Sequence, residues 1–114
     1  MRIRMRAVAA GAISAIALAG AAAPGLAAAK TITVTTTKSA PMTLTGVPKT
    51  LKAGTYTFKY INTSGIGHNL KVGSAATPVF ANGTKTIKVT LRKGKVAYEC
   101  MPHRSVMKGT IKVT

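Results

Sequence analysis

From Lys30 onward, apolar and polar residues alternate in short runs, with the two-residue period of a β-strand and not the 3.6-residue period of a helix. The clearest run is 55–62, where Tyr56, Phe58 and Tyr60 share one face and polar residues share the other. Pro, Gly and Asn separate the runs, as expected for turns. The pattern predicts seven short strands, at residues 31–36, 42–45, 55–62, 68–72, 85–91, 95–100 and 109–114.

Seven short strands with turn signals between them are typical of an antiparallel β-sandwich, so the predicted fold class is all-β. The alternation places Ile87, Val89 and Leu91 on the inner face of one strand. Further residues expected to fill the core are Met42, Val79 and Phe80.

The first 29 residues follow a different pattern. Three arginines at the start precede an apolar, alanine-rich run at 7–23, and three alanines end at residue 29. This is the layout of a secretory signal peptide with cleavage before Lys30, whereas a membrane anchor would need a longer run. We therefore expect a signal peptide at 1–29, one domain at 30–114, and export to the periplasm, the cell envelope or the exterior.

The charge balance is strongly basic. The chain has 17 basic residues and one acid, Glu99; three arginines lie in the leader, which leaves 14 basic residues and a net charge of +13. Without carboxylate pairs, the chain lacks the groups for glycoside cleavage, for a calcium or magnesium cage, and for a Ser-His-Asp triad. We therefore expect no enzymatic activity, and partners that carry negative charge.

The only cysteine, both histidines and a methionine occur in the order His68, Cys100, His103, Met107. A soft thiolate, two imidazoles and a weak thioether are the ligand set of a type 1 copper site. Cys100 ends a predicted strand, and the next two candidates follow in one short loop. A lone cysteine or methionine is more often a core residue, so the prediction depends on the whole set.

Two stretches carry a family resemblance, namely Gly67-His68-Asn69-Leu70 and Tyr98-x-Cys100-x-x-His103-x-x-x-Met107-x-Gly109-Thr110-Ile111. They resemble small bacterial cupredoxins of the plastocyanin, pseudoazurin and amicyanin type. The resemblance implies a cupredoxin-like Greek-key β-sandwich of about seven strands with one type 1 copper ion. It also implies His68, Cys100 and His103 as equatorial ligands and Met107 as the axial ligand.

The same resemblance implies two further roles. The backbone amide of Asn69 would donate a hydrogen bond to the Cys100 sulfur and tune the reduction potential. The edge of His103 would lie in an apolar patch through which the electron passes, formed by Ile66, Pro102 and Val106.

The function expected from these features is a single-electron carrier with an acidic redox protein as partner. Two alternatives use the same features: a copper carrier or buffer without electron relay, and a basic module that adheres to an anionic cell surface or lipid. We expect no specific nucleic-acid partner and a monomeric state.

Overall fold

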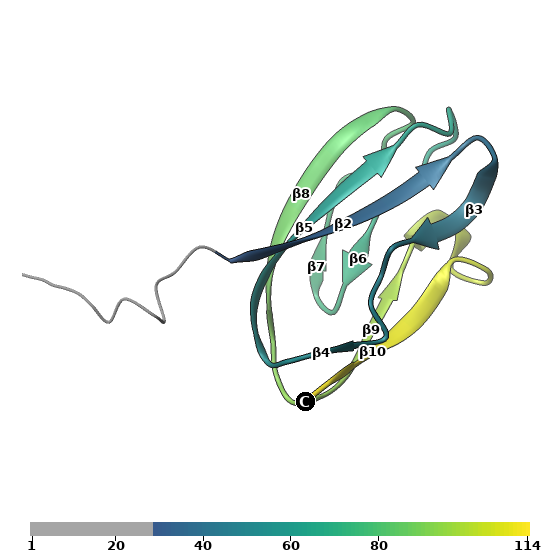
Figure 1. The fold of residues 1–114 in the computed structure, drawn as a ribbon. Helices are drawn as coiled ribbons and strands as arrows, with labels where there is room; N and C mark the ends of the chain where they lie inside the picture. Colours follow the sequence, from purple (N-terminus) through teal and green to yellow (C-terminus); the bar gives the residue numbers. More distant parts are fainter. Residues whose placement is uncertain (1–28) are drawn as a thin grey trace, which may run out of the picture.

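The computed structural model describes residues 29–114 and confirms the all-β sandwich (Figure 1). The predicted signal peptide lies outside the described residues, apart from Ala29. Within residues 29–114, no helix has the length and apolar character needed to cross a membrane.

The two sheets contain four and five strands. The four-stranded sheet has the order β3-β2-β5-β8, with β2 (Lys30–Thr37), β3 (Ala40–Thr45), β5 (Gly54–Asn62) and β8 (Gly83–Leu91). The five-stranded sheet has the order β4-β10-β9-β6-β7, with β4 (Thr50–Leu51), β6 (Lys71–Val72), β7 (Ala75–Ala76), β9 (Gly94–Glu99) and β10 (Lys108–Val113). One short 3-10 helix, η2 (Met101–His103), follows β9.

The sheets are mixed, so the purely antiparallel prediction is wrong at two pairings. β2 pairs with β5 in parallel, and β10 pairs with β4 in parallel. A hairpin can join only antiparallel neighbours, so each parallel pair requires intervening chain that leaves the pair and returns. In both cases that chain contains strands of the sandwich, and no α-helix lies among the described residues.

Strand boundaries differ from the prediction mainly at the shortest strands. The predicted strand 68–72 is reduced to β6 at 71–72, and His68 makes an isolated bridge with Phe80. β4 and β7 have two residues each and lie in segments predicted as turn and connection. Two-residue strands carry too little alternation to be recognised from sequence.

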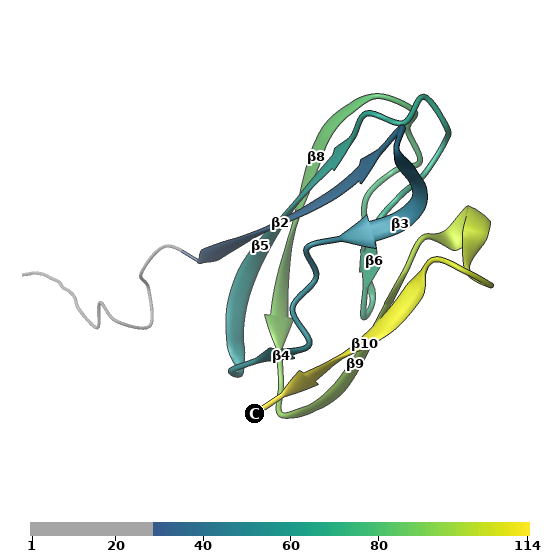
Figure 2. The same ribbon diagram turned by 45° about the vertical axis from the view of Figure 1, so that its right-hand side comes forward.

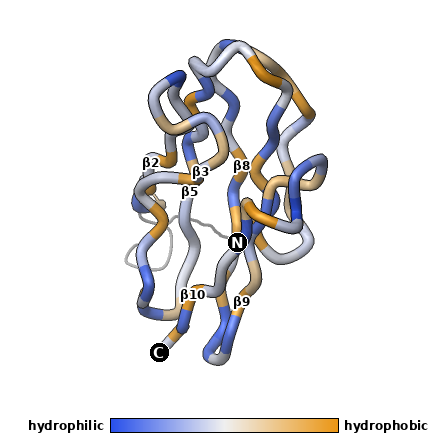
Figure 3. Tube along the Cα trace, turned by 90° about the vertical axis from the view of Figure 1, so that its right-hand side faces the viewer, coloured by the Kyte–Doolittle hydropathy of each residue, from blue (hydrophilic) through white to orange (hydrophobic). Residues whose placement is uncertain are grey.

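The core lies between the inner faces of the two sheets. Phe58 and Tyr60 of β5 are fully buried, and Figure 3 shows the alternation of hydrophobic and hydrophilic residues in the β9–β10 hairpin that faces them. Phe80 packs against this core as predicted. Val79 does not, because 54% of its surface is exposed beside the Phe80 bridge.

Met42 is also more exposed than predicted, at 37%. It lies two residues before the buried Leu44 and so shares the inner face of β3, an edge strand. A cavity borders Met42 and Met107 on this side, so Met42 is not enclosed by core residues.

Gly109 is required by the packing of Tyr98. The two residues are cross-strand partners in the β9–β10 hairpin, and a Cβ at Gly109 would overlap the Tyr98 ring. The hydroxyl end of the Tyr98 ring therefore occupies the space beside Gly109.

Candidate metal centre

Three predicted ligand atoms converge at one end of the sandwich. Cys100 follows β9, His103 ends η2, and His68 lies before β6. The Nδ1 atoms of the two histidines are 3.1 Å apart, and each is 3.6 Å from the Cys100 sulfur. This is the one cluster of three potential metal-binding groups within residues 29–114.

These separations fit a bound metal ion. Metal bonds to imidazole nitrogen and to thiolate sulfur are about 2.0–2.3 Å long, so ligand atoms around one ion lie roughly 3–4 Å apart. Nitrogen and sulfur donors of this kind suit copper. The three residues therefore match the donor set and the spacing that a copper ion requires.

The loop that holds Cys100 and His103, which connects β9 to β10 in Figure 2, is closed by its own backbone hydrogen bonds. The Cys100 amide donates to the Met107 carbonyl at 2.9 Å, and the Met107 amide donates to the His103 carbonyl at 2.8 Å. The His103 amide in turn donates to the Cys100 carbonyl at 3.1 Å. This pattern fixes the positions of all three residues relative to one another.

Met107 is buried at the same end of the sandwich, with 1% of its surface exposed. Its backbone contacts with Cys100 and His103 place it beside the other three candidates. A thioether is a weak ligand, and its burial here keeps it from solvent.

His68 is held in place from two sides. Its backbone amide and carbonyl both bond to Phe80, at 3.1 and 2.9 Å. The Phe80 carbonyl also accepts a 2.7 Å hydrogen bond from the side chain of Asn62. Asn62 is fully buried at the end of β5 and binds Ile66 and Ser64 as well, so it joins the loop before His68 to the rest of the site.

Asn69 connects the two segments that carry the ligands. Its side-chain oxygen accepts a 2.7 Å hydrogen bond from the Met101 amide, and its side-chain amide donates to the Thr77 carbonyl at 3.2 Å. No hydrogen bond from the Asn69 backbone amide to the Cys100 sulfur is present among the described residues. Asn69 thus lies beside the site and links the segment of His68 to the segment of Cys100.

Burial lowers the pKa of His68, and the nearby His103 lowers it further, while the Pro41 carbonyl acts in the opposite direction. The ring is fully buried, and its Nε2 makes no hydrogen bond that meets the usual distance and angle limits. A low pKa keeps the imidazole neutral, which is the form that binds metal.

The residues predicted to surround the exposed edge of His103 are accessible. His103 is half-buried, Pro102 is exposed, and Ile66 and Val106 expose 42% and 62% of their surfaces. Exposed apolar residues grouped at one end of a small protein are a common feature of contact surfaces.

Asn62, which sequence reasoning missed, provides a test of this support. Asn62→Ala should lower the free energy of unfolding of the copper-free protein by about 2–3 kcal/mol, because buried backbone and hydroxyl groups lose their partner. Urea unfolding measures the change. The exposed Asn82→Ala is the matched control, expected to change stability by less than about 0.5 kcal/mol. Equal effects of the two changes would contradict the assigned role of Asn62.

The lowered pKa of His68 predicts a pH dependence of the copper-free protein. As pH falls below about 6.5, His68 binds a proton in the unfolded chain before it does so in the folded one, so the free energy of unfolding decreases. Urea unfolding at a series of pH values between about 7.5 and 5 measures the slope. His68→Gln should flatten this slope. Stability that rises on acidification would contradict the assignment.

Comparisons with known proteins agree with this geometry. The family model described as "Copper binding proteins, plastocyanin/azurin family" matches residues 30–114. A reduced Cu(I) form of an amicyanin variant is 27% identical, covers 77% of this chain and 86% of its own, and superimposes with a TM-score of 0.53. Auracyanin A, a "blue" copper protein from Chloroflexus aurantiacus, is 17% identical, covers 76% of this chain and 100% of its own, and has a TM-score of 0.61. At this identity the similarity supports the fold alone. The comparison with curated protein sequences finds no match.

Proposed function

Because the chain belongs to the plastocyanin/azurin family of copper-binding proteins, we propose that it is an exported blue copper protein that carries single electrons between redox partners. The chain is a small cupredoxin, and copper is its cofactor. The observation that carries the proposal is the convergence of two imidazole nitrogens and one buried thiol within 3.6 Å of each other.

In this proposal His68, Cys100 and His103 hold the copper ion, and Met107 is the weak axial ligand. Copper supplies the one-electron chemistry when bound. The backbone hydrogen bonds of the loop from Cys100 to Met107 and of the Phe80 bridge would hold these ligands in place in both oxidation states. Little rearrangement of the protein is then needed for each transfer.

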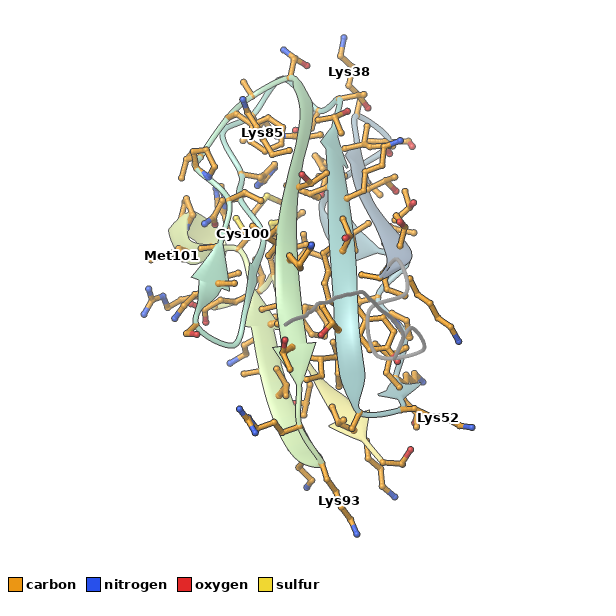
Figure 4. All side chains as sticks on the ribbon, turned by 90° about the vertical axis from the view of Figure 1, so that its left-hand side faces the viewer. Lys38, Lys52, Lys85, Lys93, Cys100 and Met101 are labelled. Carbon is orange, nitrogen blue, oxygen red and sulfur yellow. The ribbon has the colours of Figure 1, made fainter. Side chains whose placement is uncertain are left out.

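The exposed edge of His103, with Ile66, Pro102 and Val106 around it, is the proposed contact point for the electron. Arg104 lies on the same loop, and its guanidinium is 3.7 Å from Glu99. Lysines elsewhere extend outward from both ends of the sandwich, as Figure 4 shows for Lys38, Lys52, Lys85 and Lys93. The partner proposed for such a surface is an acidic redox protein.

Association with an acidic partner should weaken steeply as salt is added. Exposed charges are screened beyond a Debye length of about 8 Å at physiological ionic strength, so an attraction based on many lysines depends on salt. Association rates measured by stopped-flow from low to high salt test this expectation. Rates that do not change with salt would show that the basic surface has no part in partner binding.

An electron carrier and a copper carrier use the same ligands, so the test must follow both the electron and the metal. The reduced copper protein is mixed with an oxidised redox protein and, separately, with a Cu(I) chelator of known affinity. An electron carrier transfers its electron quickly and keeps its copper, as measured by metal analysis of the separated proteins. Rapid transfer of copper with slow electron transfer would favour the copper carrier.

Adhesion to anionic vesicles unchanged by Cys100→Ser would favour the adhesion module.

Export is proposed from the leader pattern of residues 1–29. The intact mass of the protein recovered outside the cytoplasm should correspond to a chain that begins at Lys30. A chain that retains the leader would contradict cleavage.

A further inference from the structure

A cavity of about 160 Å³ opens between β3 and the loop that leads into β10. Figures 1 and 2 show these two segments facing each other at the metal-binding end of the sandwich. The residues that line the cavity include Met42, Leu44, Tyr98, Val106, Met107 and Lys108.

Two methionines line this cavity, and they differ in exposure. Met42 exposes 37% of its surface, whereas Met107 exposes 1%. Thioether sulfur is a soft ligand that suits Cu(I) better than hard divalent ions. The cavity therefore has one soft donor accessible from solvent and a second one at the buried metal centre.

Copper needs a route to the site, because His68 and Cys100 are fully buried. We infer that Met42 is the first binding position for incoming Cu(I), which then moves across the cavity to Met107 and its neighbours. This inference rests on the proposed copper function. It assigns a role in copper loading to Met42, which is not one of the four proposed copper ligands.

Lys108 at the edge of the cavity favours the monovalent ion. Coulomb repulsion from its ammonium group is twice as large for Cu(II) as for Cu(I) at the same distance. No change of oxidation state is needed during loading. The thioether of Met42 replaces one ligand of the incoming Cu(I) complex and is replaced in turn, and the Cys100 thiol releases its proton to solvent when it binds.

The rate of Cu(I) uptake by the copper-free protein tests this inference. A Cu(I) chelator complex is mixed with the wild-type chain, Met42→Leu and Met101→Leu, and loss of the complex is followed by stopped-flow. Met42→Leu should slow uptake about tenfold, equivalent to about 1.4 kcal/mol in the barrier. Met101 is the matched control because it is similarly exposed, at 41%, and is not among the residues that line the cavity. The control should load at the wild-type rate.

Equal Cu(I) uptake rates for Met42→Leu and wild type would overturn the inference and indicate loading past the half-buried His103. Equal slowing of Cu(I) uptake by Met42→Leu and Met101→Leu would also overturn the inference. The same holds if Met42→Leu slows Cu(II) uptake as much as it slows Cu(I) uptake. After loading and oxidation, Met42→Leu should have the same visible spectrum as wild type.

A second measurement separates this inference from the proposed function. Ag(I), a soft monovalent substitute for Cu(I), is added to the Cys100→Ser chain, and the methionine methyl signals are followed by NMR. The Met42 methyl should shift at lower Ag(I) than the Met101 methyl, whether or not the wild-type chain forms a blue site. A Met101 shift as early as that of Met42 would overturn the role of Met42.

Discussion

Cys100→Ser should abolish the intense visible absorption of the Cu(II)-loaded protein, because the sulfur-to-copper charge transfer that produces it requires the thiolate. The hydroxyl of serine is smaller and harder, and it does not ionise near neutral pH. The two histidine Nδ1 atoms, which are 3.1 Å apart in the wild-type protein, are retained in this variant, so weak copper binding is still expected. Absorption spectra of equal concentrations of the two proteins after Cu(II) addition measure the difference.

Met101→Leu is the control for this change. Met101 is adjacent to Cys100, but 41% of its surface is exposed, and it lies at the outer margin of the sandwich in Figure 4. Its replacement should leave the absorption intact. Absorption that survives Cys100→Ser would remove the thiolate from the site.

Removal of copper should lower the melting temperature by about 15–30 °C. A ligand present at about 1,000 times its dissociation constant stabilises the folded state by about 4 kcal/mol, and each kcal/mol shifts the melting temperature of a domain this small by roughly 4–8 °C. The effect is large because a domain of this size has a small core. Calorimetry of the copper-loaded and the chelator-treated protein measures it.

The Cys100→Ser chain is the control for copper removal, since it should show only a small difference between the two conditions. A wild-type melting temperature that is the same with and without copper would show that the ion is not held by the folded structure.

The long strands and the ligands could be predicted because their signals are local. β5 alternates over nine residues, and Cys100, His103 and Met107 lie within eight residues of each other. The chain has only one cysteine and two histidines, so their occurrence together in this order is a specific signal. Convergence of His68 with the loop was predicted from a strand that begins at His68; in the structure His68 lies before β6 and is held by its bridge with Phe80.

The parallel pairings and the supporting hydrogen bonds depend on contacts between distant residues, which periodicity does not report. β2 and β5 alternate equally well in either direction, so their parallel register was not predictable. Asn62 had one usable signal: it continues the inward positions of Tyr56, Phe58 and Tyr60 with a polar side chain. A polar residue at an inward position requires partners, and here they are the groups that hold His68.

The exposure of Met42 could not be predicted for a different reason. The sequence predicts Met42 as a core residue, but a cavity occupies the space where core packing was expected, and 37% of its surface is exposed. Cavities depend on how two sheets fit together, and the alternation along one strand contains no such information.

The most direct test of the account is a spectroelectrochemical titration of the purified chain from Lys30 to Thr114 with copper. We predict that one equivalent of Cu(II) gives an intense visible band, that reduction bleaches it, and that reoxidation restores it at the same potential over repeated cycles with the copper retained. A protein that takes up Cu(II) without this band, or that loses its copper on reduction, would contradict the assignment of a blue copper electron carrier.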